Sequence, residues 1–400
     1  MLIEHLNRQL RERESGSLTR RRQILDSPCG PRADLQGSSL LAFCSNDYLG
    51  LANDPHLSAA MAEGAMRWGV GSGASHLISG HLQPHDALEH ALAEFLEPCV
   101  PQARALSFST GYLSNLALVT ALGAETATIF ADKLNHASLV DGALLARAPL
   151  QRYAHGRLDV LEARLQQCTT PIKLIVTDAV FSMDGDIADL PALLAIAERH
   201  DAWLIIDDAH GFGVLGAQGR GAVSHFGLSS ERIILMGTLG KAAGVAGAFV
   251  VAHPTVIEWL IQTARPYIYT TAAPPAVAHT VLASLELIRG KVGERQRTKL
   301  AGLIRLLREQ LSPLIARGAD LGWRMPDSQT AIQPLIVGNS ETALWLSSEL
   351  RSLGLWVPAV RPPTVPAGTA RLRISLSAAH DESDIEQLVS ALAHAMEMIR

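Results

Sequence analysis

Strand and helix patterns alternate along the middle of the chain, between residues 105 and 251. Short apolar runs typical of buried strands are separated by stretches in which apolar side chains recur at helical spacing. Such alternation predicts an α/β fold with a mostly parallel sheet, whose ligands lie beyond the carboxyl ends of the strands. We expect strands at Ala105–Phe108, Thr126–Phe130, Ile172–Thr177, Trp203–Asp207, Ile233–Met236 and Gly247–Val251, and helices at Leu113–Leu122, Ser138–Arg147, Leu158–Gln167 and Leu190–His200.

The ends of the chain carry different patterns. Leu2, Ile3, Leu6 and Leu10 predict an amphipathic N-terminal helix, and Leu40–Cys44 a short strand. Residues beyond the Pro274-Pro275 pair predict a smaller α+β unit. We expect three parts: an N-terminal helix and arm (1–45), a large domain (46–290) and a small C-terminal α+β domain (291–400). The last part should hold helices at Lys299–Leu314, Glu341–Leu353 and Asp381–Ile399 and strands at Ala331–Val337, Leu355–Val357 and Ala370–Ser375.

Composition excludes several classes of function. The net charge of -5, with mixed signs along the chain, argues against a nucleic-acid surface. The four cysteines form no C-x-x-C pair, so we expect reduced thiols and neither a zinc site nor a disulfide framework. No uninterrupted apolar segment resembles a signal peptide or a membrane span. We therefore expect a soluble, cytoplasmic protein.

Lys241 lies in a loop of small residues directly after the predicted strand Ile233–Met236. Burial disfavours the charged ammonium, so a lysine enclosed by glycine and alanine can act as a neutral amine nucleophile. Thr238, three residues earlier, can add a hydroxyl group to a phosphate site. Lysines in arbitrary loops are more often solvated, so this interpretation depends on the residues that meet Lys241 in the fold.

Two further turns offer groups that a cofactor needs. Gly111 and Tyr112 lie between a predicted strand and a helix, where backbone N–H groups can hold a phosphate. Asp207 ends an apolar strand, and a carboxylate there can pair with the protonated ring nitrogen of a pyridoxal cofactor. Asp208 must then point to the other face. Capping of the next turn by Asp207, and an ordinary polar turn at Ser182, remain alternatives.

Seven motifs in order along the chain resemble those of the α-oxoamine synthases, pyridoxal-phosphate enzymes of the aspartate-aminotransferase fold type. This family joins an amino acid to an acyl thioester with loss of carbon dioxide. The resemblance implies a three-layer large domain with a mostly parallel central sheet and a smaller C-terminal α+β domain. The motifs are Ser45–Gly50, Gly71–Leu77, Asn135–Ser138, Phe181–Gly185, Asp207–Gly211, Thr238–Lys241 and Arg361–Pro366.

The resemblance also implies roles for individual residues. Lys241 would form the Schiff base with pyridoxal 5'-phosphate, Asp207 would face its ring nitrogen, and His136 would stack on the ring. Ser182 and His210 would bind its hydroxyl side, and Gly111, Tyr112 and Thr238 would line the pocket and the phosphate. Thr270 or Thr271 would reach the phosphate of a partner subunit. Arg361 would bind the amino-acid carboxylate, and Arg20, His136 and Thr364 would contact substrate.

The same resemblance implies the substrates and the assembly. We expect L-alanine and a pimeloyl thioester, carried on CoA or on an acyl carrier protein, as in biotin biosynthesis. Glycine with acetyl-CoA is the alternative pair. We also expect a homodimer with its sites at the interface, no metal, no nucleic acid and no membrane.

Two other classes of function compete with this interpretation. Gly211–Gly216 matches the G-x-G-x-x-G pattern of nicotinamide enzymes and follows a strand, but the next residues continue as a glycine-rich loop and predict no helix. A binding protein without catalysis could share the fold, since fold alone does not fix activity. The presence of both Lys241 and Asp207 argues against that possibility.

Overall fold

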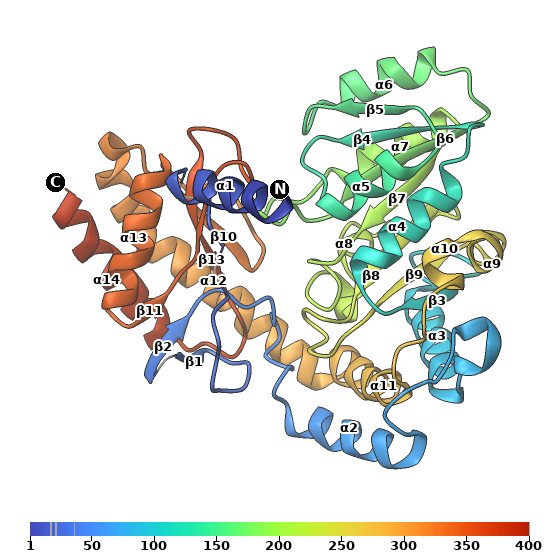
Figure 1. Cartoon of the computed structure of the whole chain (residues 1–400), viewed down its shortest axis with the longest axis horizontal. Coiled ribbons are helices and arrows are strands. Elements are labelled where there is room, and N and C mark those ends of the chain that lie inside the picture. Colours follow the sequence, from blue (N-terminus) through green and yellow to red (C-terminus); the bar gives the residue numbers. More distant parts are fainter. Residues whose placement is uncertain (17, 21, 36, 400) are drawn as a thin grey trace.

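The computed structural model describes residues 1–16, 18–20, 22–35 and 37–399. Within them, a seven-stranded sheet has the order β3–β9–β8–β7–β6–β4–β5 (Figure 1). Only β9 runs antiparallel to its neighbours, which confirms the predicted mostly parallel sheet. The strands are β3 (Arg104–Phe108), β4 (Ala127–Asp132), β5 (Leu150–Tyr153), β6 (Ile172–Asp178), β7 (Trp203–Asp207), β8 (Ile233–Thr238) and β9 (Ala248–Ala252).

Helices cover both faces of this sheet because its strands are apolar on both sides. In β7, Ile205 packs into one core, while Leu204 and Ile206 pack into the other. The result is the predicted three-layer α/β sandwich. One layer contains α4 (Gly111–Leu122), α5 (Ala137–Leu145), α9 (Pro254–Thr263) and α10 (Arg265–Ile268), and the other α3 (Gln83–Leu96), α6 (Leu158–Gln167), α7 (Leu190–Arg199) and α11 (Pro275–Arg289).

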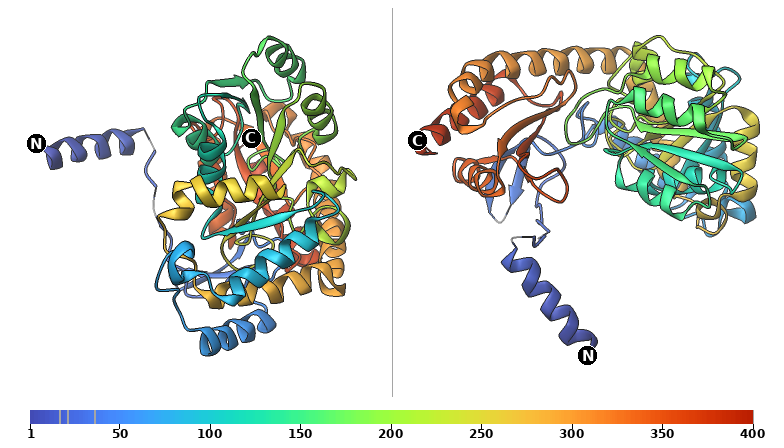
Figure 2. Two further views of the ribbon diagram at one scale, coloured as in Figure 1. Left: turned by 90° about the vertical axis from the view of Figure 1, so that its right-hand side faces the viewer. Right: turned by 90° about the horizontal axis from the view of Figure 1, so that it is seen from above.

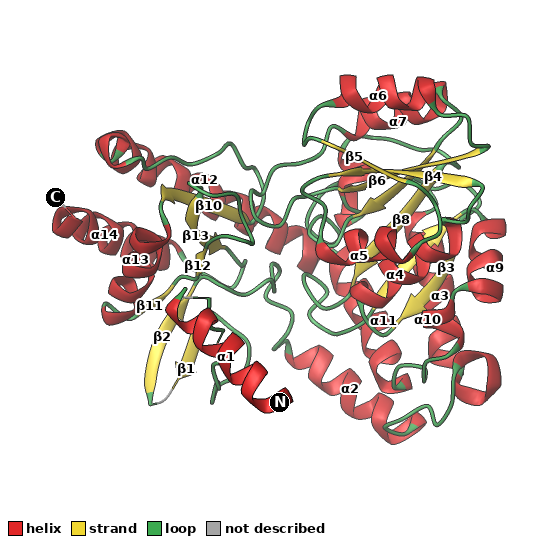
Figure 3. Cartoon of the chain, turned by 45° about the horizontal axis from the view of Figure 1, so that its top comes forward, coloured by secondary structure: helices red, strands yellow, loops and turns green. Residues whose placement is uncertain are grey.

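The C-terminal part has its own sheet, in the order β10–β13–β12, with antiparallel neighbours (Figure 3). The predicted smaller α+β unit is therefore present. Its sheet contains β10 (Ile332–Gly338), β12 (Ala359–Val360) and β13 (Ala370–Ser375), and its helices are α12 (Lys291–Arg317), α13 (Ser340–Ser352) and α14 (Glu382–Ile399).

The N-terminal strands join the C-terminal part of the molecule. β1 (Arg32–Leu35) pairs with β2 (Ser38–Ala42), and β2 pairs with β11 (Leu355–Trp356). The division at residues 45 and 290 remains a prediction. The pairing shows that the strands of the first segment lie beside those of the last one.

Shorter or peripheral elements are α2 (Pro55–Trp68), which packs on α11, the π-helix η1 (His76–Gly80), η2 (Ala217–Gly219), α8 (Ala222–His225) and η3 (Ala319–Leu321).

The helix expected at Lys299–Leu314 is longer than its apolar spacing indicates. It begins at Lys291 and ends at Arg317, and it runs from the large part to the small part (Figure 2). Its first turns are mostly polar, so they gave no helical signal. Gly293 allows these turns to pack on α11, because a Cβ there would lie 2.1 Å from the carbonyl oxygen of Ile288.

Helix α1 (Leu2–Ser15) projects away from the rest of the chain (Figure 2). The predicted N-terminal helix is therefore present, but none of its residues is buried. Arg20 follows it, and Arg21 lies outside the described residues. Among the helices that the structure describes, none combines the length and the apolar character needed to cross a bilayer.

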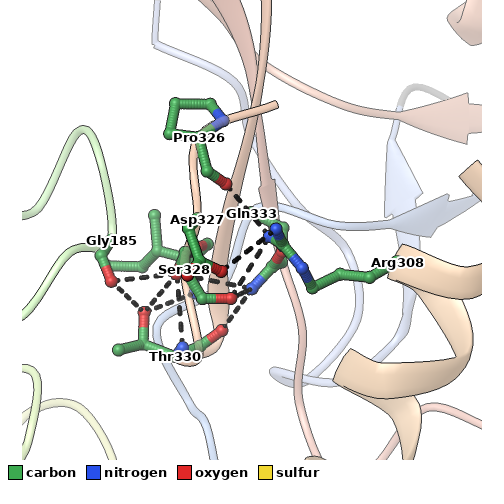
Figure 4. Close-up of polar contacts among 8 residues, drawn as sticks. Gly185, Arg308, Pro326, Asp327, Ser328, Thr330 and Gln333 are labelled. Carbon is green, nitrogen blue, oxygen red and sulfur yellow. Dashed lines mark hydrogen bonds and ion pairs between the residues drawn. The ribbon is translucent and has the colours of Figure 1, made fainter. Parts of the chain in front are cut away.

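A turn after β6 in the large part forms hydrogen bonds to the C-terminal part of the molecule (Figure 4). The carbonyl oxygen of Gly185 accepts hydrogen bonds from Oγ of Ser328 at 2.9 Å and Oγ1 of Thr330 at 3.0 Å. Gln333 and Arg308 hold the segment that carries those two hydroxyl groups. Gly185 has φ +73°, and a Cβ on it would meet the oxygen of Ile332 at 2.3 Å, so this contact requires glycine.

Candidate active site

A cavity of about 200 Å³ lies at the carboxyl ends of β6, β7 and β8, where the parallel sheet predicts a ligand site. Seven of the predicted site residues meet there: Gly111, Tyr112, His136, Asp207, His210, Thr238 and Lys241. The remaining lining residues are Asn115, Ser138, Asp178, Ala209 and Met236.

Lys241 follows β8 and points its amine into this cavity. Nζ of Lys241 lies 2.8 Å from Nε2 of His210. Burial lowers the pKa of Lys241 to about 8, although the charges of Asp207 and Asp178 act in the opposite direction. A substantial fraction of the amine is therefore neutral near pH 8, as a nucleophilic lysine requires.

Asp207 ends β7, and its carboxylate is held in one orientation by two donors. Nδ2 of Asn115 donates to Oδ2 of Asp207 at 2.7 Å, and the backbone N–H of Ala209 donates to Oδ1 at 3.0 Å. Asp208 points away from the cavity, as predicted, and its Oδ2 accepts from the backbone N–H of Ala222 at 2.7 Å. Asp207 is therefore the member of the pair that can face a ligand.

Gly211, the first residue of Gly211–Gly216, and Gly221 leave room for Asp208. A Cβ on Gly211 would lie 2.1 Å from Oδ1 of Asp208, and one on Gly221 would lie 1.8 Å from Oδ2. Only the four-residue helix α8 follows this loop. Close packing on a buried carboxyl group thus accounts for Gly211, and the positive φ angles of Gly213 (+83°) and Gly216 (+72°) account for the other two glycines of the nicotinamide-like pattern.

His136 has two roles in the structure. Its Nδ1 caps α5 by accepting from the backbone N–H of Ser138 at 3.3 Å, and its ring lines the cavity. Burial lowers the pKa of His136, the charge of Asp207 raises it, and that of Lys241 lowers it. His136 therefore caps α5 and lines the cavity at the same time.

The N-terminus of α4 forms one wall of the cavity. Thr110 caps this helix by accepting from the N–H of Leu113 at 3.2 Å. The N–H groups in the first turn of a helix have no partner within the helix and can bind an anion. Oγ1 of Thr238 lies close by, so Gly111, Tyr112 and Thr238 are arranged as a phosphate site would require.

Ser182 and Thr271 do not line this cavity. Ser182 lies in the turn after β6, and its carbonyl oxygen accepts from Nε of Arg373 at 2.7 Å. Thr271 follows α10 and is exposed. The roles predicted for these two side chains therefore remain predictions.

Arg20, Arg361 and Thr364 meet in a second cavity of about 240 Å³. Leu18, Met183 and the proline pair 362–363 also line it. None of its lining residues lines the cavity of Lys241. Three of the four predicted substrate-contacting residues are thus brought together apart from the reactive lysine, whereas the fourth, His136, lines the cavity of Lys241.

Sequence reasoning missed three residues in or beside the site. Asn115 lies inside α4 among apolar residues, and Asp178 ends β6 directly beside Asp207 in the sheet register. Burial and the charge of Asp207 raise the pKa of Asp178 well above its usual range. Arg373 is buried in β13, where arginine is uncommon, and its charge further lowers the pKa of Lys241. That unusual position was the one available hint.

The residues of the cavity fit a pyridoxal phosphate. A partly neutral amine lies near a carboxylate with fixed orientation, and a helix N-terminus is available for a phosphate. Oδ1 of Asn115 is buried and has no partner among the described residues, which leaves an acceptor free beside Asp207. Lys241, Asp207, His136, Gly111 and Thr238 would hold the group.

Comparison with known proteins is consistent with this geometry. The chain is 68% identical to the 8-amino-7-oxononanoate synthase of Polaromonas naphthalenivorans, and the alignment covers 99% of this chain and 98% of that one. It is 60% identical to the enzyme of the same name from Cupriavidus metallidurans, again over 99% and 98%.

Solved structures share the architecture. A serine palmitoyltransferase from Sphingomonas wittichii matches with a TM-score of 0.88 and 30% identity, covering 100% of this chain and 98% of that one. The 8-amino-7-oxononanoate synthase of Francisella tularensis matches with a TM-score of 0.74 and 32% identity, covering 90% and 98%. The family model described as "Aminotransferase class I and II" matches residues 38–392. The chain therefore belongs to the class I and II aminotransferase family.

Proposed function

We propose that this chain is a pyridoxal-phosphate-dependent acyltransferase that condenses L-alanine with a pimeloyl thioester. The products would be 8-amino-7-oxononanoate, carbon dioxide and the free thiol of CoA or of a carrier protein, in biotin biosynthesis. The observation that carries the proposal is that a half-buried, partly neutral Lys241 and Asp207 line one cavity, in a chain 55–68% identical over its length to relatives of that name.

The cofactor, when bound, would supply an electron sink for negative charge at the α-carbon of alanine. Lys241 would hold it and, once free, would take the α-proton of alanine, because its pKa of about 8 suits a base near neutral pH. Asp207 would stabilise positive charge on the ring nitrogen of the cofactor. The two hydrogen bonds that its carboxylate accepts, from Asn115 and Ala209, preserve its orientation.

The remaining residues would bind and orient the substrates. The reaction forms a bond between the alanine α-carbon and the acyl carbonyl carbon, breaks the carbon–sulfur bond, and releases the alanine carboxylate as carbon dioxide. We propose that Arg361 binds the alanine carboxylate and that Arg20 and Thr364 contact substrate. A guanidinium matches a planar carboxylate with two parallel hydrogen bonds.

We also propose that the chain acts as a cytoplasmic homodimer. Thr271 is exposed outside the cavity, and α1 has its apolar side chains uncovered, so both are accessible to a second copy. Thr270 or Thr271 would then reach the phosphate in the partner subunit. Light scattering of the purified chain tests the assembly, and a strictly monomeric active enzyme would exclude it.

Turnover of two substrate pairs tests the proposed reaction. L-alanine with pimeloyl-CoA should exceed glycine with acetyl-CoA in kcat/KM by at least about tenfold, since added methylenes in an apolar pocket discriminate on that scale. Pimeloyl-carrier protein serves as a third donor, and Lys241→Arg as the inactive control. Preferential turnover of glycine with acetyl-CoA would replace the proposal with the 2-amino-3-ketobutyrate CoA ligase reaction.

A further inference from the structure

A chain of hydrogen bonds leads from the amine of Lys241 to a buried arginine in the C-terminal part. Nζ of Lys241 lies 2.8 Å from Nε2 of His210, and Nδ1 of that ring lies 2.6 Å from the hydroxyl oxygen of Tyr48. The Tyr48 hydroxyl lies 3.1 Å from Oδ1 of Asn46, which is also 3.3 Å from both terminal nitrogens of Arg373. These five residues come from four separate segments of the chain.

The contacts at the Arg373 end favour one direction for these hydrogen bonds. Arginine has only donors, so the Asn46 atom that it contacts must be the amide oxygen. The Tyr48 hydroxyl donates to the same oxygen. A phenol has a single proton, and once that proton points to Asn46, only lone pairs of the Tyr48 oxygen remain for His210.

His210 is neutral in this environment. Burial lowers its pKa well below the usual range, and the charges of Lys241, Arg373 and His136 lower it further. A neutral imidazole carries one N–H. When the Tyr48 proton points to Asn46, the Tyr48 oxygen can only accept from His210. This direction places the ring proton on Nδ1 and leaves Nε2 as an acceptor for Lys241.

We propose that Tyr48 is a positioning residue that fixes His210 as the Nδ1–H tautomer, so that Nε2 presents a lone pair to Lys241 and to proton-donating groups in the cavity. The proposal rests on the proposed function only in taking Lys241 as the reactive amine. Tyr48 itself is buried and does not line the cavity.

The fixed tautomer has a consequence for Lys241. A lone pair at Nε2 accepts an N–H from Lys241 in either protonation state, so the amine keeps its position as it titrates. The other charged or titratable groups around Lys241 are Asp207, Asp178, Arg373 and His136. All of them remain when only the Tyr48 hydroxyl is removed, so Tyr48→Phe isolates the effect of the tautomer.

The opposite direction is chemically possible and experimentally distinct. Tyr48 would then donate to Nδ1, His210 would carry its proton on Nε2, and that N–H could bond only to a neutral Lys241. Within this series of hydrogen bonds, Oδ1 of Asn46 would then accept only from Arg373. The two directions therefore differ in which ring nitrogen of His210 carries hydrogen.

Nuclear magnetic resonance of the full chain labelled with ¹⁵N-histidine measures this directly. The His210 signals are identified by their loss in His210→Gln. We expect the Nδ1–H tautomer in the wild type near neutral pH and a mixture of tautomers in Tyr48→Phe. Asn46→Ala should turn the Tyr48 proton toward His210 and produce the Nε2–H form. The readout requires no turnover, so it can fail while the proposed reaction stands.

Tyr153→Phe is the matched control. Tyr153 is as buried as Tyr48, but its hydroxyl has no partner among the residues described by the structure. We expect this variant to leave the His210 tautomer unchanged.

The pH dependence of covalent attachment of pyridoxal phosphate at Lys241 gives a second readout. Without the Tyr48 hydroxyl, His210 can carry its proton on Nε2 and donate it to the neutral amine of Lys241. Because this hydrogen bond favours the neutral form, Tyr48→Phe should lower the pKa of Lys241 by about half to one unit. Tyr153→Phe should not shift it. An Nε2–H tautomer in the wild type, or a Tyr48→Phe chain indistinguishable from Tyr153→Phe in both readouts, would overturn the proposal.

Discussion

Asp207 and Asp208 are adjacent in the sequence, but their carboxyl groups lie in different surroundings. Asp207 faces the cavity and accepts from Asn115, whereas Asp208 accepts from the backbone of Ala222 behind β7. Burial raises the pKa of Asp208 well above its usual range. The two side chains therefore offer a matched comparison between a charge at the site and a carboxyl group used in packing.

Replacement of these aspartates by asparagine should affect turnover very differently. Asp207→Asn removes the charge opposite Lys241, and kcat should fall by about a hundredfold or more, the usual cost of losing a preorganised electrostatic group. Asp208→Asn changes a group that burial already drives toward the neutral form, so kcat should change by less than about threefold. Equal losses in steady-state kinetics would contradict the assignment.

The lowered pKa of Lys241 should appear in the pH dependence of its reaction with pyridoxal phosphate. Because only the neutral amine reacts, the rate of attachment should rise about tenfold per pH unit below pH 8 and level off above it. Free Nα-acetyl-lysine, measured in parallel, corrects for titration of the aldehyde reagent. A rate that continues to rise beyond pH 10 would show an ordinary, solvated lysine.

Arg361→Lys tests which substrate this arginine binds. Lysine keeps the charge but loses the paired hydrogen bonds, so the KM for L-alanine should rise about tenfold while that for pimeloyl-CoA stays within about twofold. Arg157→Lys, at an exposed ion pair with Asp159, is the control. A rise confined to pimeloyl-CoA would instead assign Arg361, whose cavity is separate from that of Lys241, to the acyl substrate.

His155 ties two aspartates together beside the turn that carries Ser182. Its Nδ1 lies 3.1 Å from Oδ2 of Asp132, and its Nε2 lies 2.8 Å from Oδ2 of Asp186. Hydrogen bonds to these carboxylates raise the pKa of His155 to about 10. A raised pKa in the folded state stabilises the fold fully below about pH 6.5, and this contribution is lost as the pH rises through about 10.

Asp186→Asn should therefore reduce the free energy of unfolding more at about pH 7 than at about pH 10. Urea denaturation of the variant and the wild type at both pH values measures the difference. Asp86→Asn, which removes the partner of the exposed His90, should have little effect at either pH. A destabilisation by Asp186→Asn that does not depend on pH would show that His155 is not protonated in the fold.

The strands that carry the site were predictable because each is a continuous apolar run ending in a polar residue, as Trp203–Asp207 does. β5 was missed because Leu150–Tyr153 is half polar, and α9 because its helical start depends on the capping side chain of His253.

The contacts around Lys241 could not be predicted from local patterns. Tyr48 and His210 are 162 residues apart in the sequence, and Arg373 comes from the C-terminal sheet. Only the folded chain brings these groups together. Their positions depend on packing between elements, which no periodicity in one segment encodes.

Identification of the residue that binds pyridoxal phosphate tests the central claim most directly. The purified chain is loaded with the cofactor, reduced with borohydride, digested and analysed by mass spectrometry. The account predicts one major adduct, on the peptide that contains Lys241, and its loss in Lys241→Arg. An adduct on a different lysine, or no adduct after complete loading, would contradict it.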